Sequence, residues 1–283
     1  MLVVSIVHSF SNPPSPSASS ETTIQSSRPL LARVRAAYDK MCFARLMGEL
    51  FARKDPPMPL DIDASNHPVY PATFGGMNHA NRVLMSCIME FGKTLFPEFE
   101  RLKFEEKRSI AVKFFYTFRK FDNVFRSEKY FADNIDRNFG TYIMWLSEDI
   151  VEHFFDDLEK GRGDIEQAKK VMLEKCDKPR VGREFLQRVN LDEEEFLAMI
   201  TLMFWAQNGL DEIPEVTKIE ERYRSEIFSE LHNYYREVLK MENYASRLGE
   251  LQMFLPLYER HQGVKEMFEV LRLLDIYSED CFT

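Results

Sequence analysis

Apolar residues recur at steps of three and four along most of this chain, which is the spacing of one face of an α-helix. The pattern predicts an amphipathic helix over residues 30–53 and longer helices over residues 77–95 and 104–130. The last of these carries an aromatic stripe, formed by Phe114, Phe118, Phe121 and Phe125. Rings so closely spaced on one face are too apolar for water, so we expect this helix in the middle of the molecule.

Helical spacing resumes in the second half of the chain and predicts six further helices. They cover residues 147–160, 164–176, 180–189, 192–207, 214–239 and 244–277, the last kinked at Pro256. Before them, residues 133–145 break the pattern with Asn and Gly followed by an apolar run, which indicates turns around at most one small β-hairpin. The sequence therefore predicts an all-α protein of about nine helices.

The N-terminal part of the chain has a different composition. Residues 11–27 are rich in Ser, Pro and Thr and hold too few apolar groups to offset the entropy of folding. We therefore expect a flexible tail over residues 1–28 and a folded domain over residues 29–283. Five prolines within residues 54–74 predict a loop in that domain, so its best-supported part is residues 75–283.

Charge and cysteine content narrow the function classes. The chain has 37 Lys and Arg against 46 Asp and Glu, a net charge of −9. This balance disfavours direct binding to nucleic acid, because such binding neutralises phosphates with cations. The four cysteines are far apart, with no Cys-x-x-Cys pair for zinc, and fit reduced intracellular thiols. No apolar stretch approaches the roughly 20 residues that span a bilayer, so no membrane partner is expected.

The sequence carries none of the common catalytic or metal-binding motifs. It has no Gly-x-x-x-x-Gly-Lys phosphate loop, no Gly-x-Ser-x-Gly nucleophile elbow and no His-Glu-x-x-His zinc helix. Glu152 beside His153, and the acidic run at residues 193–195, fit solvent-facing helix positions better than acid/base pairs. We therefore expect no catalytic residues, no metal and no resident cofactor.

Four segments occur in an order that points to a known family. Lys93–Phe99 reads Lys-Thr-Leu-Phe-Pro-Glu-Phe, and Phe196–Trp205 is a Phe-rich helix that ends in Trp. Glu230–Tyr235 reads Glu-Leu-His-Asn-Tyr-Tyr, and Tyr244–Leu251 contains Arg-Leu-Gly-Glu-Leu. In this order and spacing, the chain resembles the ligand-binding domain of nuclear hormone receptors, specifically the divergent set expanded in nematodes. The resemblance covers about residues 75–283 and implies a three-layer antiparallel sandwich of helices.

The resemblance implies a domain that encloses a small lipophilic ligand and signals its occupancy to transcriptional coregulators. A pocket lined by apolar and aromatic groups is the expected form of such a site. The residues that we expect to line it face inward from the two central helices: Leu84, Cys87, Ile88, Phe91, Phe115 and Phe118. A phenylalanine stripe can equally form a solid core, and the domain is then a ligand-independent helical interaction module. The sequence leaves both alternatives open.

The resemblance also implies surfaces for protein partners. Lys93 matches the lysine that caps a docked coregulator helix, and Lys113 falls near the family's other groove lysine. A cation there opposes the negative C-terminal end of that helix. Residues 274–283 depart from the family, because they lack the glutamate between apolar pairs that completes the clamp. Family receptors often form homo- or heterodimers through the last long helix. The contacts expected on that helix are Leu248, Leu251 and Leu255.

Family receptors also carry two zinc modules, each held by four cysteines, ahead of this domain. The chain has no such cluster, so we expect no sequence-specific DNA binding by it. We therefore expect either a receptor variant or gene fragment that lacks the DNA-binding part, or a sequence whose start is mis-assigned. By resemblance, we expect a regulator of transcription that resides in the nucleus and also in the cytoplasm.

Overall fold

A computed structural model describes residues 29–54, 67–159, 163–206, 214–259, 269–274 and 276, with the backbone alone at residues 175–179 and 254–259. The helices are α2 (Pro29–Phe51), α3 (Phe74–Leu95), α4 (Pro97–Arg101), α5 (Phe104–Tyr130), α6 (Glu148–Val151), α7 (Ile165–Val189), α8 (Glu193–Trp205), α9 (Pro214–Asn233), the π-helix η2 (Tyr234–Val238) and α10 (Ala245–Glu259). The strands are β1 (Tyr70–Pro71), β2 (Asn138–Phe139) and β3 (Met144–Leu146). The predicted tail over residues 1–28 lies outside the described residues.

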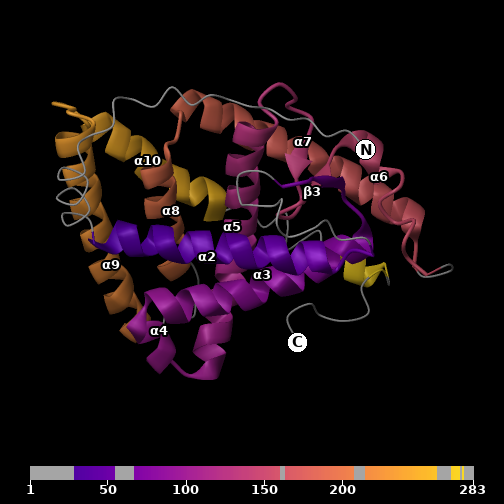
Figure 1. The fold of residues 1–283 in the computed structure, drawn as a ribbon, viewed down its shortest axis with the longest axis horizontal. Helices are drawn as coiled ribbons and strands as arrows, with labels where there is room; N and C mark the ends of the chain where they lie inside the picture. Colours follow the sequence, from indigo (N-terminus) through magenta and orange to yellow (C-terminus); the bar gives the residue numbers. More distant parts are fainter. Residues whose placement is uncertain are drawn as a thin grey trace.

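The helices are arranged in three layers (Figure 1). α2 and α3 lie side by side in one outer layer. α5 and α8 form the middle layer, because α5 packs between α3 and α7 while α8 packs between α2 and α10. α7 and α10 lie on the far side, and α9 closes one edge against α8 and α2. The expected all-α helical sandwich is confirmed.

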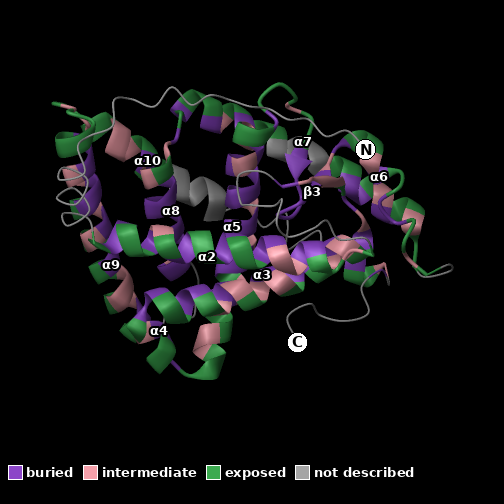
Figure 2. Cartoon of the chain, in the orientation of Figure 1, coloured by how far each residue is buried: buried purple, intermediate pink, exposed green. Residues whose placement is uncertain are grey.

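The middle layer is buried because its helices are apolar on more than one face. On α5, the side chains of Phe114, Phe115, Phe118 and Phe121 are at most 1% exposed, which confirms the central position predicted for this helix. Every residue of α8 from Glu195 to Trp205 is buried (Figure 2). The Asp192 carboxylate caps α8 by accepting a hydrogen bond from the backbone N–H of Glu195. The sequence therefore acts in two ways. The Asp192 cap fixes where α8 begins, and the apolar side chains of α5 and α8 bury both helices in the core.

A small sheet covers one end of the layers. β2 pairs antiparallel with β3, with Phe139 opposite Trp145, so the β element predicted after the aromatic helix is present. β1 adds a third strand parallel to β3, with Tyr70 opposite Met144. The sequence pattern missed β1 because its two residues lie in a proline-rich stretch and pair only with a segment far along the chain.

Several helix bounds differ from the predicted ones. α7 is a single helix through Pro179, where two were predicted, because buried residues on both sides of the proline, including Met172 and Arg183, hold it in the fold. α6 has only four residues and gives way to turns. The predicted helix over residues 214–239 changes to π-helical turns at Tyr234. α10 runs to Glu259, and residues 260–268 of its predicted continuation are outside the described part of the chain.

Candidate functional site

Five of the six residues predicted to line a pocket share the interior core between α3 and α5. Each is at most 3% exposed; they are Leu84, Ile88 and Phe91 on α3, and Phe115 and Phe118 on α5. The sixth, Cys87, is only partly buried and lines a surface groove beside α2. The fold thus brings five predicted residues together and directs the sixth to a different side of α3.

Aromatic rings fill the interior where α3 and α5 approach α8. Phe91 stacks on Phe114 with 6.1 Å between ring centroids, and Phe114 stacks on Phe118 at 5.0 Å. Phe204 of α8 meets Phe91 at 5.9 Å and the edge of Phe114 at 5.0 Å. Offset and edge-on pairs of this kind are the favoured arrangements of aromatic rings. The interior next to α8 is therefore solid.

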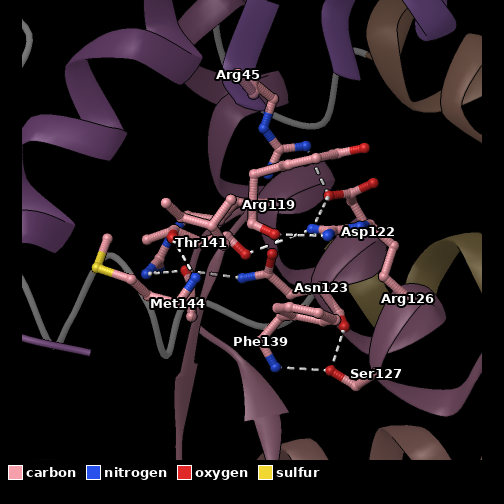
Figure 3. Close-up of polar contacts among 12 residues, drawn as sticks. Arg45, Arg119, Asp122, Asn123, Arg126, Ser127, Phe139, Thr141 and Met144 are labelled. Carbon is pink, nitrogen blue, oxygen red and sulfur yellow. Dashed lines mark hydrogen bonds and ion pairs between the residues drawn. The ribbon is translucent and has the colours of Figure 1, made fainter. Parts of the chain in front are cut away.

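A buried ion pair joins α2 to α5 beside these rings (Figure 3). Arg45 Nη1 lies 2.7 Å from Asp122 Oδ2, and the two side chains are 1% and 0% exposed. The hydroxyl of Tyr38 donates to the other Asp122 oxygen at 2.7 Å. Burial lowers the pKa of Arg45, but the Asp122 and Glu49 carboxylates together raise that pKa above its usual value. The guanidinium therefore stays charged inside the core.

Glu49, one turn after Arg45 on α2, holds the turn between β2 and β3. Its carboxylate accepts a hydrogen bond from Thr141 Oγ1 at 2.7 Å. It also accepts from the backbone N–H groups of Tyr142 and Ile143, each at 3.1 Å. These three bonds satisfy a carboxylate that is only 4% exposed.

α5 holds the same turn from the other side (Figure 3). Arg119 Nη2 and Asn123 Nδ2 each donate to the carbonyl oxygen of Gly140 at 3.0 Å. One turn further along α5, Ser127 Oγ accepts from the backbone N–H of Phe139 at 2.7 Å. The turn is therefore clamped by polar side chains of two helices, which fixes the end of the interior opposite α8.

Several buried polar side-chain atoms have no hydrogen-bond partner among the described residues. One of them is Nδ2 of Asn81 on α3, whose side chain is 1% exposed. Asn81 precedes Leu84 and Ile88 by three and seven residues, so it shares the inward face of α3 with the predicted pocket lining. A buried donor without an acceptor costs about 1–3 kcal/mol. Asn81 is therefore one polar group of the interior that can receive an acceptor.

Arg45, Glu49, Asp122 and Asn81 were not among the residues predicted from the sequence. A signal was present, because each stands at a helix position where the spacing calls for an apolar residue. Asp122, for example, follows Phe118 by four residues on the inward face of α5. A charged residue in an apolar stripe is informative, since such groups are rarely buried without a partner.

The two predicted coregulator lysines lie on the surface. Lys93 is in the last turn of α3, and Lys113 is in the first half of α5; both side chains are exposed. Neither has a buried contact that would assign it a structural role. Residues 277–283, where the sequence lacks the family's clamp glutamate, are outside the described residues.

The helix predicted to form a dimer is anchored by one arginine. Arg247 of α10 donates from Nε to Glu195 Oε1 at 2.6 Å and also bonds the backbone carbonyls of Val189 and Asn190 at the end of α7. Tyr235 donates its hydroxyl to the same Glu195 oxygen at 2.7 Å. The segments that carry the family resemblance in the C-terminal third therefore meet at one junction.

Of the three leucines predicted on that helix, Leu251 is 1% exposed and faces the core. Leu248 is partly buried and packs against the same core. The side chain of Leu255 is outside the described part. The exposed side of α10 instead carries Met253, which is 75% exposed.

The layered fold, the central aromatic helix and this junction can be set against known proteins. The family model described as the ligand-binding domain of nuclear hormone receptor matches residues 65–274. The chain belongs to the nuclear hormone receptor family. The resemblance seen in the sequence is thereby confirmed, and the four motif segments all lie within the matched range.

Relatives of this receptor chain include three proteins of Caenorhabditis elegans. Nuclear hormone receptor family member nhr-16 is 26% identical, over 94% of this chain and 68% of its own length. Family member nhr-12 is 23% identical, over 87% of this chain and 53% of its own. The high zinc activated nuclear receptor protein is 25% identical, over 60% of this chain and 42% of its own. The chain thus spans about half to two thirds of the first two relatives.

The described residues offer neither a membrane span nor a metal site. No described helix of this receptor domain is both long and apolar enough to cross a bilayer. Within the same residues, no three His, Cys, Asp or Glu side chains gather where they could hold a metal ion.

Proposed function

We propose that this receptor domain regulates transcription by binding a small, largely apolar ligand and protein coregulators, without a catalytic step. Membership of the nuclear hormone receptor family supports receptor-type regulation. It also supports a nuclear location, which immunofluorescence of the tagged protein in nematode cells would test. The folded unit that we assign to this function is residues 29–283.

The observation that carries the ligand proposal is Asn81. Its buried, unpartnered Nδ2 lies on the same face of α3 as Leu84 and Ile88, opposite the solid end at α8. An apolar wall with a few convergent polar groups is the usual form of a small-molecule site. We therefore infer a lipophilic molecule that presents one hydrogen-bond acceptor, such as a carbonyl or hydroxyl oxygen, to Asn81.

Purified protein tests this directly. Mass spectrometry of solvent extracts should recover the same lipid-sized molecule from independent preparations of the wild type. Asn81→Leu should lose that molecule, because the acceptor then meets a methyl group. The matched control is Leu84→Met, which keeps the volume and the amide and should retain the molecule.

The alternative is a ligand-independent interaction module with a solid aromatic core, and the stacked rings of Phe91, Phe114 and Phe118 favour it. It predicts empty extracts. It also predicts that Asn81→Leu raises the free energy of unfolding by about 1–2 kcal/mol, because an unpaired buried amide is removed. Empty extracts together with that gain would reject the ligand proposal.

We further propose that Lys93 and Lys113 form the coregulator surface and that α10 contributes to a homo- or heterodimer through Leu248, Leu251 and Leu255. Exposure of both lysines supports the first proposal. Lys93→Glu should weaken binding of an amphipathic helical peptide severalfold, since a cation that opposes the helix C-terminus is replaced by an anion. Lys170→Glu on α7 is the charge-matched control at an exposed position elsewhere. Equal binding by the two variants would remove Lys93 from the site.

A further inference from the structure

A concave feature lies on the outer face of the domain between α2 and α3, and it reaches inward as far as the buried Phe91. This α2–α3 groove has a volume of about 180 Å³. Its lining includes Met41, Ala44, Cys87 and Phe91, with Lys40 and Glu90 at its edges. The exposed side chains of Lys40, Ala44 and Glu90 show that it opens to solvent. The groove draws on α2 and α3, whereas the proposed coregulator lysines lie on α3 and α5.

The size of the groove limits what it can hold. Pockets for drug-sized ligands are typically about 300–1,000 Å³ and enclose most of the molecule. A smaller, open groove suits one large apolar side chain that projects from a protein segment. The same helix α2 also exposes two large apolar side chains, since Phe43 and Phe51 are each 56% exposed.

The charges at the edges indicate the kind of segment. Lys40 Nζ lies 3.2 Å from Glu90 Oε1 across the groove, and both side chains are more than half exposed. At one end, Arg33 donates to the carbonyl oxygen of Leu95, next to Thr94 of the groove lining. Two cations, Arg33 and Lys40, against Glu90 make this edge positive on a chain whose net charge is −9. An acidic segment is the complementary partner.

We propose that the α2–α3 groove docks an acidic segment of another protein that carries one large apolar side chain. That side chain enters between Met41 and Phe91, and carboxylates beside it pair with Arg33 and Lys40. Apolar burial supplies most of the affinity, while the charges set the partner and make binding weaker at high salt.

A synthetic peptide tests the proposal on the full chain. The probe is a short fluorescein-labelled peptide with one tryptophan flanked by aspartates, and binding is followed by fluorescence anisotropy. Replacing its tryptophan by alanine should weaken binding at least about tenfold, as expected for a central anchor. Replacing its aspartates by lysines should do the same. A lysine peptide that binds as well as the aspartate peptide would overturn the proposal.

Variants locate the peptide on the protein. Ala44→Trp fills the groove and should weaken binding at least about tenfold. Ala36→Trp places the same ring at an exposed position of α2 outside the groove lining and should leave binding unchanged. Lys40→Glu should weaken binding about threefold and flatten its salt dependence. Equal loss in both tryptophan variants would refute the assignment, and circular dichroism confirms that each variant is folded.

The accessibility of the Cys87 thiol shows whether the peptide occupies the groove, and this test needs no variant. Alkylation by N-ethylmaleimide, measured by mass spectrometry of the tryptic peptide that contains Cys87, should slow at least about fivefold in saturating aspartate peptide. Cys42, which is buried, supplies an internal reference in the same digest. Unchanged alkylation of Cys87 with the peptide bound would place the peptide elsewhere and overturn the proposal.

Discussion

The buried pair of Arg45 and Asp122 makes a sharp test of how α2 is held on the domain. Asp122→Asn removes the ion-pair partner of the Arg45 guanidinium, whose side chain is 1% exposed, and leaves only the influence of Glu49. At the observed separation of 2.7 Å, the Coulomb attraction lost is about 6 kcal/mol with an effective dielectric constant of about 20. Part of this loss is offset because the carboxylate no longer has to be stripped of water. Breaking such a pair on one side costs about 3–5 kcal/mol in measured cases, and we expect that range here.

Two further variants separate charge from packing. Tyr38→Phe removes one hydrogen bond to Asp122 but keeps the ion pair, and it should cost about 1 kcal/mol. The double variant Arg45→Met with Asp122→Leu removes both charges and fills their space. It should be within about 2 kcal/mol of the wild type, because the two desolvation costs vanish together with the attraction.

Urea unfolding measures these changes. Circular dichroism reports the helices, and fluorescence reports Trp145 and Trp205, both of which are buried. The unfolding free energies can be compared if circular dichroism and fluorescence give the same transition and if all variants share one slope of free energy against urea concentration. A loss below about 1 kcal/mol in Asp122→Asn would refute the reasoning. The reasoning would also be refuted if the double variant lost as much stability as Arg45→Met and Asp122→Leu made singly and added together.

Three other outcomes follow from particular contacts. Gly92→Ala should destabilise the fold by about 1–3 kcal/mol in urea unfolding, because its new methyl would lie 2.7 Å from the Phe204 ring. An unchanged unfolding free energy would mean that the ring moves aside. Arg247→Met removes the cation paired with Glu195 and should lower the free energy of unfolding by about 3 kcal/mol. The variant should also speed amide hydrogen exchange more in α10 than in α3. An equal increase in both helices would argue against a local anchor. Burial raises the pKa of Cys87 above its ordinary value, so less thiolate forms at a given pH than in a free cysteine. Its alkylation by iodoacetamide should therefore still be rising above about pH 9, whereas a plateau near pH 8 would contradict this.

The sequence determined the helices and much of what they bury. Spacing at three and four residues depends only on neighbours along the chain, so it located α5 at Phe104–Tyr130 as predicted and placed its phenylalanines in the core. The order of the four motif segments was sufficient to identify the family. In the structure, Tyr235 and Arg247 from these segments both bond to Glu195, which directly precedes the Phe196–Trp205 segment, and that shared junction is a physical reason for the motifs to occur together.

The tertiary structure decided what depends on pairing between distant residues. Strand β1 exists because β3 lies beside it, and α7 passes through Pro179 because both of its halves are packed. Arg45 is tolerated in the core only because Asp122, 77 positions away, meets it there. The spacing on α3 assigned Cys87 to the interior with Ile88, yet neighbouring positions on a helix point about 100° apart. Only the packing of α2 against α3 showed that one faces a core and the other an open groove.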